Sequence, residues 1–228
     1  MRPFGIGPAL TTALTLAVAG CAHPPAPKPP AVPAKTSTNN AAVNPANIKR
    51  VVRDLPPGYE VTTGIPSAAS PRVIWSLGDD LQAKPATCGT LADPGNGRDQ
   101  SAQGISASGS GGIVNAVVVA LPGPVDFPGE LVTACAQWSE TAGNTVVHVH
   151  LIDAPHVEGV QTVGMVADVK SSVESGTEID SHIYTFTAYL GNYYAFTTLT
   201  TDPGSALPVL PPQFAADLLA KTVSTLRS

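Results

Sequence analysis

Charged residues are scarce in this sequence, and basic residues are scarce in most of it. Only 13% of its 228 residues are charged. From Asp54 onward there are 17 acidic but only 6 basic residues, so this part of the chain carries a net charge of −11. Proteins bind nucleic acids through basic faces. The deficit therefore argues against a nucleic-acid partner.

Catalytic signatures are also missing. Residues 104–108 come closest to the G-x-S-x-G elbow of serine hydrolases, but they lack the final glycine. The glycine-rich residues 108–112 lack the G-K-[ST] ending of a phosphate-binding loop, and a hairpin turn accounts for them. We therefore expect neither an enzyme nor a bound cofactor.

After Cys21, no apolar run is long enough to span a bilayer. Residues 1–20 combine a single charge, Arg2, with an apolar run and small residues next to Cys21, a pattern typical of secretory signals. The ending resembles the bacterial lipobox, and that resemblance implies cleavage before Cys21 and acylation of this residue by diacylglycerol and palmitate. The alternatives are an ordinary signal peptide with a chance cysteine, and an uncleaved membrane helix, for which the run is short.

Two or three acyl chains anchor a protein stably, whereas one alone does not. We therefore expect a lipid-anchored protein on the extracytoplasmic face of the cell membrane. Residues 21–45 form a proline- and alanine-rich stalk with too few large apolar side chains to fold. Residues 46–228 then make up one globular domain.

Only two cysteines, Cys88 and Cys135, remain once Cys21 is acylated. Outside the cytosol two cysteines most simply form a disulfide, the alternative being two buried free thiols.

The residue patterns predict an α+β fold, a twisted antiparallel sheet of about six to eight strands with packed helices. Glycine and proline total 44 residues, which favours strands and loops over long helices. We predict strands at residues 59–65, 73–77, 103–108, 113–121 (buried on both faces), 145–152, 183–190 and 193–201. We predict helices opening at Pro45, at 130–140 with Cys135 inside, and at 213–226, a C-terminal amphipathic helix. Residues 159–174 fit helix or strand, and 84–91 a helical turn.

His148 and His150 are two residues apart on a predicted strand, so both side chains point to the same face. A histidine pair near carboxylates is a candidate for zinc. The alternative is two exposed or groove-lining histidines. Because a third ligand of defined spacing is lacking, no metal is predicted.

Six of the twelve aromatic residues fall between residues 184 and 196. Core packing and ordinary strand propensity explain such a cluster. The alternative is a groove for an apolar or glycan ligand, since aromatic rings with polar tips suit such sites. The candidate groove residues are Tyr189, Tyr193 and Tyr194.

Several short motifs follow one another along the chain in a characteristic order. They are LPPGYEV (55–61), PATCGTLADPG (85–95), GISASGSGGIV (104–114), CAQW (135–138), TAYLGNYYAF (187–196) and TDPG (201–204). From about Asn47 to the C-terminus the chain thereby resembles a family of mycobacterial and related actinobacterial lipoproteins of unknown function. That family is similar to the extracellular sensor domain of certain mycobacterial serine/threonine kinases.

The resemblance implies a twisted antiparallel sheet with helices, a groove, and a ligand-binding or sensing role. The kinase sensor domains carry two disulfides, whereas this chain has cysteines for one. It has no kinase segment, so signalling would require a partner. We expect a non-enzymatic binding or sensor-like module of the cell envelope, whose ligand is a small molecule, a lipid or an envelope protein. The alternatives are an envelope hydrolase with an unrecognised site, and a structural or accessory protein.

Overall fold

The computed structural model describes residues 42–65, 67–78, 80–173, 176–204 and 206–228. The predicted signal, the lipidation site Cys21 and most of the predicted stalk lie outside these residues. Residues Ser37–Ser228 group into one compact unit. No helix among the described residues is long and apolar enough to cross a membrane.

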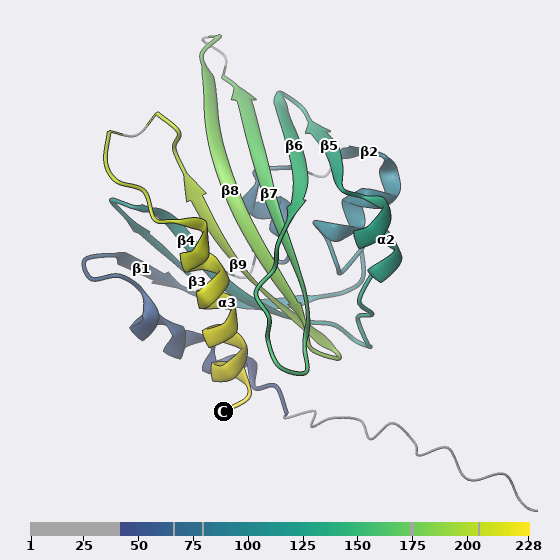
Figure 1. The fold of residues 1–228 in the computed structure, drawn as a ribbon, viewed down its shortest axis with the longest axis vertical. Coiled ribbons are helices and arrows are strands. Elements are labelled where there is room, and N and C mark those ends of the chain that lie inside the picture. The colour runs from purple at the N-terminus through teal and green to yellow at the C-terminus, as the bar shows by residue number, and fades with distance from the viewer. Residues whose placement is uncertain (1–41, 66, 79, 174–175, 205) are drawn as a thin grey trace, which may run out of the picture. The chain divides into compact units, whose positions relative to one another are not determined.

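One antiparallel sheet of nine strands forms the framework, in the order β1-β3-β4-β9-β8-β7-β6-β5-β2 (Figure 1). The strands are β1 Glu60–Thr63, β2 Gln82–Lys84, β3 Ser101–Gly109, β4 Gly112–Ala120, β5 Gln137–Ala142, β6 Thr145–Ile152, β7 Gln161–Ser172, β8 Glu178–Tyr189 and β9 Tyr193–Thr201. The strand number exceeds the predicted six to eight. Short β2 and the unpredicted β5 account for the excess.

Short helical segments cover both faces of the sheet. They are η1 Pro45–Asp54, α1 Pro71–Ile74, η2 Ala86–Leu91, α2 Gly129–Ala134 and α3 Pro212–Leu226. On one face, α3 packs against β4, β8 and β9, and η1 packs against β3 and β4 (Figure 1). On the other face, residues of α1 and η2 join a second apolar cluster, which includes Trp75, Cys88 and Leu91.

The strongest sequence patterns are confirmed. Residues 114–119 of β4 are buried throughout, as expected for a strand covered on both faces. β8 and β9 are joined by Gly191 and Asn192, and the Leu190 N–H donates to Tyr193 O at 2.8 Å to close this hairpin. α3 buries one stripe of side chains, including Leu218, Leu219 and Val223, as an amphipathic helix should.

Two predicted elements are wrong. Residues 73–77 do not form a strand, because Pro71 opens the helix α1 and Ser76 adopts a φ of 63° just after it. The predicted helix 130–140 ends at Ala134, and Cys135 follows it outside the helix. Residues 137–142 form β5 instead, since Trp138 and Glu140 alternate toward the core and β6 offers a partner strand.

The ambiguous region 159–174 is mostly strand over its described residues. Gly159, with a φ of 67°, closes the turn after β6, and β7 then runs for twelve residues between β6 and β8. At the N-terminal end the helix opening at Pro45 is confirmed as η1, a 3₁₀ helix whose cap is the Asn44 side chain.

Candidate functional site

The three predicted groove tyrosines do not share a surface. Tyr189 and Tyr194 are buried in the cluster beneath α1 and η2, 8% and 0% exposed respectively. The Tyr189 ring meets Phe127 edge to face, with ring centroids 5.5 Å apart. Tyr193 packs against the opposite face, in the cluster beneath α3. The first two therefore serve the core.

The hydroxyl groups of the two buried tyrosines differ in their partners. The Tyr194 hydroxyl donates to Ala69 O and lies 3.1 Å from Gln100 Oε1. The Tyr189 hydroxyl has no hydrogen-bond partner among the described residues. Burial raises the pKa of both phenols above the ordinary value, since a phenolate would be poorly solvated there.

His148 and His150 lie on the exposed part of the face that carries α3. Both are exposed on β6, beyond the strands that α3 and η1 cover. In the sheet register His148 stands opposite Asp168, and Asp168 stands opposite His182. The Asp168 carboxylate pairs with His182 Nδ1 rather than with His148.

A shallow depression of about 500 Å³ adjoins both histidines and is lined also by Lys84, Gln137 and Ser139. The described residues contain no group of three or more His, Cys, Asp or Glu side chains placed to hold a metal ion. His148 and His150 therefore lie on an open polar surface.

The glycine-rich residues 108–112 close the β3–β4 hairpin, with Ser110 and Gly111 as the turn between the two strands. Ser106 and Ser108 lie on β3 itself, opposite Asn115 and Ile113. Neither serine stands on a strand-to-helix elbow, which a hydrolase nucleophile of that class needs.

The predicted disulfide between Cys88 and Cys135 is formed. It joins η2 to the segment between α2 and β5, and both cysteines are 2% exposed. The bond therefore fixes η2 against the sheet, next to a cavity that sequence patterns did not predict.

The floor of that cavity holds an ion pair between a buried carboxylate and a partly exposed arginine. Asp93 is 3% exposed, and its Oδ2 accepts from Arg72 Nη2 at 2.9 Å. Its other oxygen, Oδ1, has no partner among the described residues. A buried carboxylate oxygen without a partner is costly for the stability of the fold.

Glu140 extends this polar cluster. It is fully buried on β5, and its Oε1 accepts from Trp138 Nε1 at 2.8 Å. Its Oε2 has no partner among the described residues. Burial raises the pKa of Glu140, the Trp138 hydrogen bond and the nearby Arg72 lower it, and Asp93 raises it further, with a raised pKa as the net result.

The cavity above these groups has a volume of about 450 Å³. The residues that line it are Arg72, Leu81, Gln82, Ala83, Ala86, Gly89, Thr90, Asp93 and Asn96. Gly89 lies close over the floor, since a Cβ there would be 2.9 Å from Ala83 Cβ and 3.6 Å from Glu140 Oε1. The site therefore requires glycine at this position.

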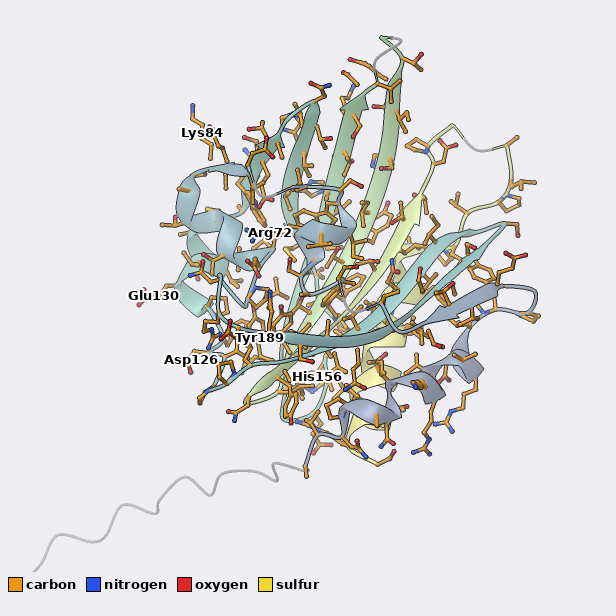
Figure 2. All side chains as sticks on the ribbon, turned by 180° about the vertical axis from the view of Figure 1, so that it is seen from behind. Arg72, Lys84, Asp126, Glu130, His156 and Tyr189 are labelled. Atoms are coloured by element: carbon orange, nitrogen blue, oxygen red, sulfur yellow. A yellow bond between two sulfur atoms is a disulfide. The ribbon has the colours of Figure 1, made fainter. Side chains whose placement is uncertain are left out.

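The wall beside Asp93 is a loop held by one arginine. Arg98 donates from Nε to Gly95 O, from Nη2 to Pro94 O, and from Nη1 to Pro124 O, at 3.1, 3.2 and 2.8 Å. Figure 2 looks onto this face and shows Arg72 among its short helices.

Sequence reasoning missed this cluster because its members are far apart in the chain. Arg72 fell in a predicted loop just before the predicted strand 73–77, and Glu140 fell in a predicted helix, while residues 93–98 looked like an ordinary loop. A partial signal was present: Trp138 and Glu140 alternate, which puts a carboxylate and an indole N–H on one buried strand face.

Comparison with known proteins places the fold but assigns no role. A family model for a domain of unknown function (DUF5642) matches residues 44–227. A crystal structure of an uncharacterized protein from Mycobacterium smegmatis, the Rv0999 ortholog, is similar with a TM-score of 0.60. The two chains are 18% identical, and the match covers 83% of this chain and 100% of the other. No curated protein matches the chain.

Proposed function

The chain belongs to the DUF5642 family of domains of unknown function, and we propose that it is a lipid-anchored, non-enzymatic ligand-binding module of the cell envelope. In this proposal Cys21 carries the lipid and holds the domain on the extracytoplasmic face of the membrane. The ligand is a small hydroxyl-rich molecule, such as a sugar unit, bound in the cavity between α1, β2 and η2.

The single observation that carries the proposal is the Arg72–Asp93 ion pair at a cavity of about 450 Å³. That volume is within the usual range of small-molecule sites. The Arg72 side chain is 34% exposed, so N–H groups that Asp93 does not occupy can donate to a ligand in the cavity.

The chemistry of the wall favours hydroxyl groups. Asp93 only accepts hydrogen bonds and Arg72 only donates them, while Thr90 does both. A ligand carboxylate would face the acidic floor, and a ligand ammonium would face the arginine. A hydroxyl group can donate to Asp93 and accept from Arg72, so a molecule with several hydroxyls forms hydrogen bonds with both residues.

A sensing role is the finer form of the proposal, supported by the resemblance to kinase sensor domains. In this form of the proposal, a signal from the bound ligand would reach the cell through another protein. The pattern of residues 1–21 supports the envelope location.

The ligand is tested on full-length protein purified from its native envelope. Small molecules released on denaturation are identified by mass spectrometry, and we expect a hydroxyl-rich compound in stoichiometric amount. Asp93→Asn should lose it, and so should Thr90→Val, which keeps the side-chain shape but removes a hydroxyl. The control is Asp126→Asn, which alters an exposed carboxylate outside the cavity. A compound retained equally by all variants, or no compound, would contradict the binding proposal.

The anchor has its own test. Growth with an alkyne-labelled fatty acid should label the wild-type protein and leave Cys21→Ala unlabelled and released from membranes. An unlabelled wild-type protein would refute anchoring without affecting the binding test.

A further inference from the structure

β8 extends beyond its neighbour β9 at one end of the sheet. β9 ends at Thr201, which pairs with His182, whereas β8 begins at Glu178. Residues 178–181 therefore pair with β7 on one side only. The next residue that could pair across from Asp180 is Pro203, which has no N–H to donate, so the chain leaves the sheet there.

The open side of β8 exposes main-chain hydrogen-bonding groups. Leu190 and Tyr193 are a hydrogen-bonded pair, and such pairs alternate along an antiparallel ladder. Even-numbered residues of β8 therefore direct their N–H and C=O toward β9. Beyond the end of β9, Asp180 and Glu178 direct these groups into a space that no other described strand fills.

A depression of about 480 Å³ marks this space. It is bordered by residues 178–181 of β8, by residues 200–202, and by the β3–β4 hairpin at Gly109, Gly112 and Ile113. Two large apolar side chains stand exposed at its border, Ile179 at 55% and Ile113 at 45%. Both have odd numbers in strands whose odd-numbered side chains face the α1 side, so they lie on the same face.

The charge of the depression is entirely acidic. Its ionisable lining residues are Glu178, Asp180 and Asp202, and all three are exposed. The nearby Lys170 Nζ lies 3.8 Å from Asp180, but both side chains are more than half exposed, so the pair is weak. A partner that fits this space is therefore basic.

We propose that the open edge of β8 at residues 178–181 binds an extended basic segment of a partner protein, which adds to the sheet as a tenth strand. This docking surface is separate from the cavity at Asp93 and does not depend on it. Main-chain hydrogen bonds to Asp180 and Glu178 hold the segment, as in other cases of strand addition.

The register defines the partner's sequence pattern. The residue opposite Ile179 faces the same side as Ile179 and is apolar. Its two neighbours stand opposite Asp180 and Glu178 on the other face, where a lysine or arginine meets a carboxylate. The pattern is basic–apolar–basic.

Two other occupants fit less well. A second copy paired edge to edge would bring its own Glu178 and Asp180 against these carboxylates, and like charges directly opposite are destabilising. The chain's own N-terminal segment enters the described structure at Ala42, beside the β8–β9 turn at the other end of β8. The two ends of β8 are eleven residue steps apart, about 36 Å. The part of the N-terminal segment that would reach residues 178–181 is proline-rich.

The test uses full-length protein and a nine-residue peptide that alternates lysine and valine. In low salt we expect it to bind at least ten times more tightly than a glutamate–valine peptide. Complete methylation of its peptide nitrogens should abolish binding, because strand addition needs those N–H groups. Amide resonances of residues 178–181 should shift when the peptide is added.

Asp180→Lys and Glu178→Lys should each weaken binding at least tenfold. The matched control is Asp126→Lys, which makes the same charge change at an exposed site elsewhere and should have little effect. Equal weakening by all three variants, undiminished binding of the methylated peptide, or no binding at millimolar peptide would overturn the proposal. So would a protein dimer that Asp180→Lys dissociates, since the edge would then bind a second copy.

Discussion

Removing the disulfide tests how the cavity wall is held. Cys88 and Cys135 are both 2% exposed, so we consider the double change Cys88→Ala and Cys135→Ala, which leaves only small apolar side chains in the core. The bond joins positions 47 residues apart. Its main expected effect is to limit the freedom of the unfolded chain between them.

The expected loss follows from the loop length. In the chain-entropy relation, a loop of 47 residues corresponds to about 4 kcal/mol at 25 °C. For a protein of this size the melting temperature should fall by about 8–16 °C. A loss of this size is a large part of the total, since native proteins have a free energy of unfolding of only about 5–15 kcal/mol.

The assay is urea unfolding followed by circular dichroism, with and without a reductant. Wild-type protein should lose the same free energy of unfolding on reduction as the double variant loses by mutation. The double variant itself should not respond to reductant, which makes it the internal control. A loss below about 1 kcal/mol with an unchanged urea dependence would refute the reasoning, since the bond would then restrict little in the unfolded chain.

Two further changes probe the core. Burial raises the pKa of Glu140 above its ordinary value of 4.5, so the folded protein holds this proton more tightly and loses stability as the pH rises from that value toward the raised pKa. Glu140→Gln keeps an acceptor for Trp138 and should remove this loss, which is about 1.4 kcal/mol for a pKa difference of one between the folded and unfolded protein. The urea midpoint of the variant should therefore change less than that of the wild type between pH 4 and 9. An unchanged pH profile would contradict the prediction. Leu219→Ala on α3, at a fully buried position, should cost about 2–5 kcal/mol in urea unfolding, whereas a cost below 1 kcal/mol would mean that α3 does not pack tightly on the sheet.

Local patterns were sufficient wherever the signal for an element lies within its own residues. The β8–β9 hairpin follows from two apolar strands around Gly191-Asn192, and α3 follows from the spacing of its leucines. The disulfide followed from cysteine number and the expected compartment. In each case the signal lies within a few residues or in a simple count.

Local patterns failed where tertiary pairing decides the structure. The helical spacing of Leu131, Cys135 and Trp138 extended the predicted helix to residue 140, yet pairing with β6 makes residues 137–142 strand β5. β2 is three residues long, and only its pairing with β5 defines it. The Arg72–Asp93 pair and Glu140 come together from three such segments, so no window of the sequence contains the cavity.

The helical layers on the two faces of the sheet also differ in how they are stabilised, and this difference matters for binding. The α3 face is covered by a helix of fifteen residues with a continuous apolar stripe. On the other face α1, η2 and α2 have only four to six residues each, too few for any of them to be stable alone. That layer depends on the Cys88–Cys135 bond, the Arg72–Asp93 pair and apolar packing. A ligand that hydrogen-bonds to both Arg72 and Asp93 would add contacts to this layer, whose helices are too short to be stable alone. Binding at the cavity should therefore slow amide hydrogen exchange in α1 and η2 and leave exchange in α3 unchanged.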